Sequence, residues 1–169
     1  MSTRYHFVTE IQLTASPQEV WKALEQSENW PQWWRWLLQA EVLDEGDDEG
    51  VGRRVRNRVT TPLGYRLTYV GTATCVVEPS LLEFRATGDL AGTGQLQIAE
   101  TGDDTEITFN WMVETTQWWM SLLVPIARRL FAWNHNRLMN DFARGLAATT
   151  NSKLISVTNH SLSPPETGL

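Results

Sequence analysis

The chain lacks the features that mark exported and membrane-spanning proteins. It has a single cysteine, Cys75, which excludes an internal disulfide and fits a reducing compartment. It contains no run of about 18 consecutive apolar residues, so we expect no integral membrane association. Its first residues, MSTRYHFVTEIQL, lack the basic segment and the apolar stretch of a signal peptide. Together these absences predict a cytoplasmic protein.

Positive charge and metal-ligand patterns are also scarce. The 169 residues carry 14 Lys and Arg against 20 Asp and Glu, a net charge of −6, whereas nucleic-acid-binding proteins usually carry a basic excess. The three histidines, His6, His135 and His160, do not have the spacing of metal ligands. Phosphate-loop, nucleophile-elbow and zinc-protease motifs are missing. We therefore expect no nucleic-acid partner, no metal and no cofactor, and most common enzyme chemistries are absent.

Tryptophan, in contrast, is abundant. The chain has nine, and four of them stand within NWPQWWRWL as Trp30, Trp33, Trp34 and Trp36. An indole is costly to leave in water, and its N–H needs a partner when it is buried. The cluster therefore fits a hydrophobic core, a lid over a ligand, or a patch that contacts a membrane or a partner. Arg35 is its only basic neighbour in an acidic chain, which favours the lid over the membrane patch.

The first part of the chain predicts a strand, a capped helix and a short aromatic helix. Residues 5–13 alternate apolar and polar side chains, which indicates a half-buried strand. Ser16 and Glu19 form the pattern of a capping box around Pro17, which predicts a helix that ends near Gln26. One or two further helical turns are expected at the tryptophans.

Residues 39–115 have the alternating pattern of an antiparallel sheet. The acidic run Asp44–Glu49 predicts a solvated hairpin loop. In the predicted strand 65–78, alternation places one set of side chains inward: Tyr65, Leu67, Tyr69, Ala73, Cys75 and Val77. The last strand of the sheet places Trp111 inward in the same way.

Residues 117–149 have helical character, and the chain beyond them does not. An apolar stripe at 3–4 spacing contains Phe131, Asn134 and Leu138. Residues 150–169 have little to bury and are predicted to be a disordered tail after a domain of residues 1–149. Because the sheet has one face to cover and only this helix is long enough, we predict an α+β fold with one layer of sheet and one of helix.

Three segments resemble a known superfamily. TEIQLTASPQEVWKAL, GDLAGTGQLQI and FAWNHNRLMNDFARGL occur in the order found in START-like (SRPBCC) proteins, and the last two resemble polyketide cyclase/dehydrase-like members. The similarity covers roughly residues 5–148. It implies a helix-grip fold, in which a curved antiparallel sheet wraps around a long C-terminal helix and leaves an internal apolar cavity. Members bind lipids, sterols, polyketides or other hydrophobic molecules, and a minority catalyse cyclisation or dehydration.

Two residues of the long helix are open to two interpretations each. Asn134 lies inside the apolar stripe, so it is either a structural asparagine or a cavity group that orients an oxygen of a ligand. His135 is either a packed or surface histidine or a general acid or base. Arg137 is expected to pair with Asp141 at i+4 on the surface. The predicted ligand-binding set is Trp34, Trp36, Tyr65, Tyr69, Trp111, Phe131, Asn134 and Leu138.

Three functions remain open from the sequence. The leading hypothesis is a module that binds a hydrophobic small molecule, with Trp34 and Trp36 gating the cavity. The second is a polyketide cyclase/dehydrase-type enzyme, in which Asn134, His135 and Tyr69 supply protons or hydrogen bonds. The third is a protein-interaction module that docks through an exposed aromatic rim, to which Trp118 and Trp119 would add.

Overall fold

The structure is a computed structural model that describes residues 4–115 and 124–162. Within these residues the chain forms eight strands, three α-helices and one 3-10 turn. In chain order they are β1 (Arg4–Leu13), α1 (Pro17–Glu25), η1 (Ser27–Asn29), α2 (Trp30–Trp33), β2 (Leu37–Asp44), β3 (Arg54–Thr60), β4 (Arg66–Val77), β5 (Leu81–Gly88), β6 (Leu90–Thr101), β7 (Asp104–Thr115), α4 (Val124–Thr149) and β8 (Leu154–Leu162).

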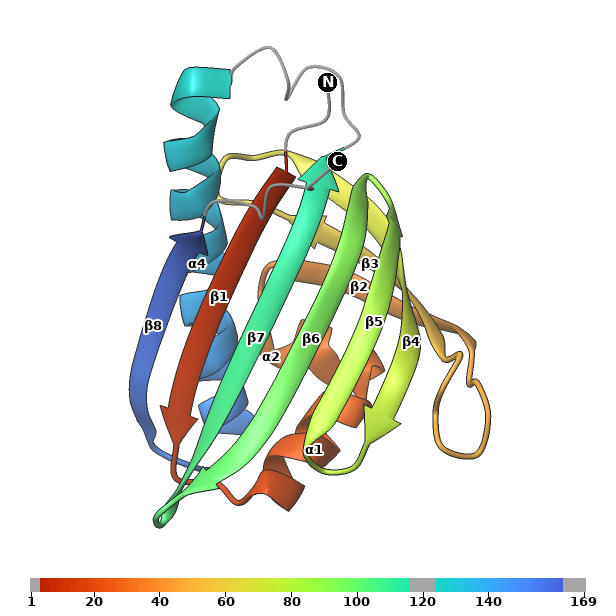
Figure 1. Ribbon diagram of the computed structural model, residues 1–169, viewed down its shortest axis with the longest axis vertical. Helices are drawn as coiled ribbons and strands as arrows, with labels where there is room; N and C mark the ends of the chain where they lie inside the picture. The colour runs from red at the N-terminus through yellow and green to blue at the C-terminus, as the bar shows by residue number, and fades with distance from the viewer. Residues whose placement is uncertain (1–3, 116–123, 163–169) are drawn as a thin grey trace, which may run out of the picture.

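All eight strands belong to one antiparallel sheet in the order β2-β3-β4-β5-β6-β7-β1-β8. Strands β2 to β7 follow one another as neighbours, and β1 and β8 complete the other edge. The sheet curves, and α1, α2 and α4 all lie against the same side of it (Figure 1). This arrangement confirms the predicted α+β helix-grip fold with a long C-terminal helix.

The N-terminal elements form as their sequence pattern predicts. Every second residue of β1 is buried, including Phe7 and Ile11, so this strand contributes one apolar face to the core. At the start of α1, the Glu19 N–H donates to Ser16 Oγ at 3.3 Å, and the Ser16 N–H donates to Glu19 Oε2 at 2.8 Å. This capping box satisfies two backbone donors that the first helical turn would otherwise leave without partners.

A bulge in β4 overturns part of the predicted face of this strand. The register with β5 shifts between Ala73 and Cys75, so one extra residue stands in β4. After it the alternation reverses: Val76 packs against the core, and Val77, which was predicted to point inward, is 49% exposed. Cys75 is half-buried. The prediction for Val77 is wrong because a single added residue exchanges the two faces of a strand.

The prediction of a disordered tail from residue 150 is wrong for residues 154–162, which form β8. This strand pairs with β1, and its Leu154 and Val157 pack against the core. Asn159 fixes it on both sides. Its Oδ1 accepts a hydrogen bond from Thr9 Oγ1 at 2.8 Å, and its Nδ2 donates to Asn140 Oδ1 on α4 at 2.8 Å. The strand is therefore held by partners far away in sequence, which its own polar composition does not indicate.

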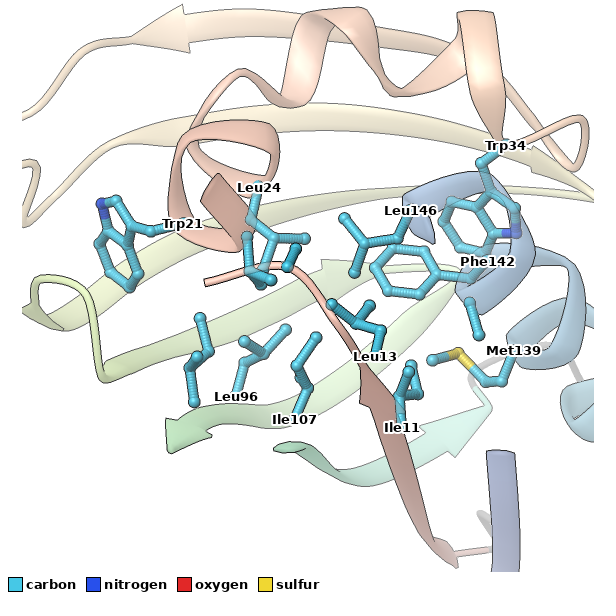
Figure 2. Close-up of a cluster of buried hydrophobic side chains, with 14 of the residues drawn as sticks. Ile11, Leu13, Trp21, Leu24, Trp34, Leu96, Ile107, Met139, Phe142 and Leu146 are labelled. Atoms are coloured by element: carbon cyan, nitrogen blue, oxygen red, sulfur yellow. The ribbon is translucent and has the colours of Figure 1, made fainter. Parts of the chain in front are cut away.

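The buried side chains form two groups, which we call the larger core and the smaller core. The larger core lies among α1, α2, the C-terminal half of α4 and the sheet; Figure 2 shows its members, with Trp34 beside Phe142. A Cβ on Gly145 would overlap the Trp33 carbonyl, so this glycine allows α2 to approach α4 closely. The smaller core consists of Tyr5, Phe7, Ala86, Trp111, Val113 and Phe131.

Candidate ligand-binding cavity

A cavity of about 170 Å³ lies between the concave face of the sheet and α4, and its walls come from both cores. The lining is aliphatic and aromatic over most of its area. Its polar side chains are tyrosines, one threonine, one asparagine and one histidine: Tyr5, Tyr65, Tyr69, Thr61, Asn134 and His135. No Asp, Glu, Lys or Arg is present among the lining residues that the structure describes.

Most of the predicted ligand-binding set lies on the wall of this cavity. The residues that line it are Trp34, Tyr65, Tyr69, Trp111, Phe131, Asn134 and Leu138. Their role in binding a ligand stays a prediction, but the structure brings them together from the end of α2, the turn before β4, the sheet and α4. Trp36 is the member of the set that does not line the cavity.

Trp36 lies instead against the side of α4. The Leu37 N–H donates to the Trp34 carbonyl at 3.0 Å, and this turn directs Trp36 away from the cavity. Its indole Nε1 donates to Asp141 Oδ2 at 2.6 Å, and the Arg35 guanidinium stands 4.6 Å from its ring centroid. Trp36 therefore fastens the start of β2 to α4.

Asp141 has different partners from the one that helical spacing predicts. Its carboxylate binds Arg35 at 2.6 Å and Arg144 at 3.4 Å, whereas Arg137 lies 5.7 Å from the ring of Trp133. The predicted Arg137–Asp141 pair is therefore wrong. Partial burial favours the neutral acid, but hydrogen bonds from Trp36 and Arg35 and the nearby positive charges outweigh it, so the pKa of Asp141 lies below its usual value.

Trp34 belongs to the core, and the other three tryptophans of the cluster are partly buried and pack against it. Trp34 is 8% exposed, its ring meets that of Phe142 edge-on at 5.2 Å, and its Nε1 donates to the Leu138 carbonyl at 3.0 Å. Trp30 also lines the cavity, and its Nε1 donates to the Ala23 carbonyl at 3.2 Å. Trp34 is thus a hydrogen-bonded part of the wall and Trp36 lies outside the lining, so the two do not stand together at a cavity entrance as the predicted gate requires. Trp118 and Trp119 lie outside the described residues.

Asn134 is a buried polar residue of the cavity wall, at 6% exposure. Its Nδ2 donates to Tyr65 Oη at 3.3 Å. Its Oδ1 is buried and has no hydrogen-bond partner within the part of the chain that the structure describes. The structural interpretation is a side chain bonded to the backbone or to a buried water, and no backbone partner for this oxygen is found among the described residues.

His135 also lines the cavity, and its ring stacks on Phe7 with centroids 4.1 Å apart and an interplanar angle of 13°. Its Nε2 is buried and has no partner among the described residues. Burial lowers the pKa of His135 to about 3, because the imidazolium would lose its hydration. The packed interpretation of this histidine is therefore supported by its stacking on Phe7.

Two tyrosines of the wall, Tyr65 and Tyr69, are also neutral at physiological pH. Burial raises the pKa of Tyr69 to about 12. Burial also raises the pKa of Tyr65 to about 12, although a hydrogen bond with Thr61 opposes this shift. With His135 neutral as well, these groups leave the interior of the cavity uncharged at pH 7.

Sequence reasoning did not assign Tyr5, Thr61 or Trp30 to the site. The sequence does contain a pattern that could have identified Tyr5, since this residue begins the alternating inward face of β1. The same kind of alternation identified Tyr69. Thr61 has no such pattern, because it follows β3 and reaches the cavity through the turn that leads to Tyr65. Position within a turn does not follow from a periodic pattern.

The fold and the cavity together define a class. A curved antiparallel sheet that encloses an apolar space against a long C-terminal helix is the START-like, helix-grip architecture. The family model described as polyketide cyclase / dehydrase and lipid transport matches residues 4–149, and the chain belongs to this family. The superfamily resemblance seen in the sequence is thus confirmed.

Solved structures share the fold at low sequence identity. The Zhui aromatase/cyclase from Streptomyces sp. R1128 is 14% identical with a TM-score of 0.70, over 88% of this chain and 94% of that one. A START superfamily protein from Mycobacterium smegmatis is 17% identical with a TM-score of 0.70, over 86% and 97%. A conserved protein from Geobacillus kaustophilus is 13% identical with a TM-score of 0.73, over 92% and 99%. A search of curated proteins finds no match.

The described residues hold neither a metal site nor a membrane-crossing helix. No three His, Cys, Asp or Glu side chains are grouped there in a way that could hold a metal ion. None of the described helices combines the length and the apolar character that crossing a bilayer requires. The cavity is therefore the site on which a function is proposed.

Proposed function

We propose that the protein binds an uncharged, hydrophobic small molecule in the cavity between the sheet and α4. The observation that carries this proposal is the lining, which is mostly apolar, contains no charged side chain among its described residues, and keeps His135 neutral. An apolar ligand gains about 25 cal/mol for each Å² that it removes from water. A charged ligand would lose its hydration there without meeting an opposite charge.

The size and the aromatic wall narrow the ligand further. The volume of about 170 Å³ is close to that of an apolar cavity of about 150 Å³ that holds benzene. One wall is a series of rings: Phe84 lies 5.4 Å from Trp111, and Phe109 stacks on Trp111 at 6.0 Å. Flat aromatic molecules pack well on such a surface. We propose a ligand with a single ring or an aliphatic group of similar volume.

A matched pair of probes tests the preference for uncharged ligands. Toluene and benzoate have the same ring, but benzoate is an anion at pH 7. We expect toluene to raise the melting temperature and benzoate to have no effect at the same concentration, because only bound ligand stabilises the native state. Native mass spectrometry of freshly purified protein would show any ligand that is retained. Stabilisation by benzoate alone, or by neither probe, would contradict the proposal.

An enzyme of the cyclase/dehydrase type is the second candidate, and the family match is the observation that favours it. Asn134 and His135 would then contact the substrate, but a histidine with a pKa of about 3 is a weak proton acceptor at pH 7. We therefore expect these residues to orient the substrate rather than to transfer protons. Incubation with a poly-ketone substrate tests this alternative: turnover that falls by less than about tenfold in His135→Ala would agree with an orienting role.

A further inference from the structure

We propose that the bound molecule carries a hydrogen-bond donor, a hydroxyl or N–H group, and that this donor binds Asn134 Oδ1. The inference rests on the proposed function and narrows the ligand to neutral molecules with an apolar body and one donor, such as phenols. Two observations lead to it: the hydrogen-bonding state of Asn134 and the division of the cavity into two unlike ends.

The amide of Asn134 is only partly satisfied. A primary amide offers two donor hydrogens and a carbonyl oxygen that accepts. Nδ2 donates to Tyr65 Oη at 3.3 Å. Oδ1 is buried without a partner among the described residues, and a small shift of the side chain would bring it to the cavity that Asn134 lines. Because burying an acceptor without a partner is costly, such an oxygen is expected to gain a donor in the functional state.

The next residue on α4 also has a buried polar atom that is not satisfied within the described residues. His135 lines the same cavity, and its Nε2 also lacks a partner in the described part of the chain. A neutral imidazole has one nitrogen that accepts a hydrogen bond. Stacking on Phe7 restricts the ring, so its edge cannot rotate freely to find another partner. A ligand donor near Asn134 therefore enters a region that, among the described residues, holds a second polar atom without a partner and no competing positive charge.

The rest of the cavity would hold the apolar body of the ligand. Along α4 the wall continues from Asn134 through Leu138 and Met139 to Phe142, over about 12 Å at 1.5 Å per residue. Leu82 and Leu96 face this end from the sheet, and the Trp30 indole closes it with its N–H already bonded to a backbone carbonyl. A ligand that places its donor at Asn134 can therefore leave its apolar part entirely among carbon atoms.

The test compares p-cresol with p-xylene, in which a methyl group replaces the hydroxyl. The dissociation constants of both probes are measured by calorimetry for the wild type and for Asn134→Leu. The ratio of the p-xylene to the p-cresol dissociation constant measures the preference of a protein for p-cresol. We expect this ratio to be at least tenfold smaller in Asn134→Leu than in the wild type. The two probes differ in hydration, but this difference is the same for both proteins and therefore cancels. The control Asn140→Leu, a substitution on the same helix outside the cavity lining, should leave the ratio unchanged.

The outcomes separate this inference from the proposed function. If both probes bind and the ratio is the same in wild type and Asn134→Leu, the inference that a ligand donor binds Asn134 Oδ1 is wrong, whereas the proposed hydrophobic site stands. If neither probe binds the wild type, both fail. A third probe, 4-methylanisole, needs no variant: it keeps the oxygen but lacks the donor, and we expect it to bind the wild type at least tenfold more weakly than p-cresol. Tighter binding of 4-methylanisole would show that Asn134 presents its N–H₂ group and would overturn the inference.

Discussion

The two ends of the cavity contain similar aromatic side chains that are fixed in different ways. At the end formed by the larger core, the indoles of Trp30 and Trp34 each donate to a backbone carbonyl. At the other end, Asn134 and His135 each keep a buried polar atom without a partner among the described residues. Satisfied polar atoms are typical of a structural wall, and we propose that the unsatisfied ones on the cavity wall are where a ligand binds. The abundance of tryptophan in the sequence therefore marks the structural end.

Substitution of Trp34 should give the largest effect. We expect Trp34→Ala to lower the free energy of unfolding by about 3–5 kcal/mol, because a large core side chain and its hydrogen bond to the Leu138 carbonyl are lost. Urea denaturation measures this change. A stable Trp34→Ala protein that has lost only ligand binding would restore the interpretation of the cluster as a lid.

His135 should make stability depend on pH. Its pKa is about 3 in the folded protein and about 6.5 when the chain unfolds, so the unfolded state takes up a proton first as the pH falls. This contribution is fully present above pH 6.5 and decreases below it, by about 2 kcal/mol between pH 7 and pH 5. His135→Phe keeps the stacking on Phe7 and should lose this part of the pH dependence. Identical profiles for both proteins would contradict the buried neutral imidazole.

Removal of the Asp141 carboxylate, which binds Trp36 and Arg35 to α4, should have an intermediate effect on stability. Asp141→Ala leaves the Trp36 indole and Arg35 without their shared carboxylate, and we expect a loss of about 1–3 kcal/mol in the free energy of unfolding. Arg137→Ala is the matched control and should cost less than about 0.5 kcal/mol, because it removes an exposed side chain. Equal losses in the two variants would favour the pair that helical spacing predicts.

Gly94 should control the volume of the cavity with a smaller effect on stability. A Cβ at this position would overlap the ring of Phe84, so Gly94→Ala should push that ring toward the cavity, weaken p-xylene binding and cost about 1 kcal/mol. Gly71→Ala is a suitable comparison, since its Cβ would meet Phe84 at an ordinary 3.7 Å. Unchanged p-xylene affinity in Gly94→Ala would show that Phe84 does not limit the space.

Much of the fold could be predicted because it depends on local patterns. The alternation of β1 and the capping box at Ser16 each follow from residues close together in sequence. The same is true of most of the wall, since inward positions of strands and one stripe of α4 become the lining. The parts that were not predicted depend on contacts between distant residues. β8 is held by pairing with β1, and Arg35 reaches Asp141 across 106 positions.

The direction of Trp36 and the exposure of Val77 show a second limit. Each depends on one local irregularity, a turn after Trp34 in one case and a bulge after Ala73 in the other. An irregularity of one residue reverses every side chain that follows it in a strand. Periodicity alone therefore predicts the segments that face the cavity more reliably than it predicts the individual residues that do so.

The most direct test of the account is calorimetric titration of p-xylene into the wild type and two variants of α4. Leu138→Phe fills the cavity wall, whereas Leu130→Phe changes an exposed residue of the same helix. We predict saturable binding at one site, with a negative heat-capacity change from buried apolar surface, in the wild type and in Leu130→Phe. Leu138→Phe should bind at least tenfold more weakly. Equal affinity in the two variants, or no binding to the wild type, would contradict the central claim that this cavity is the binding site.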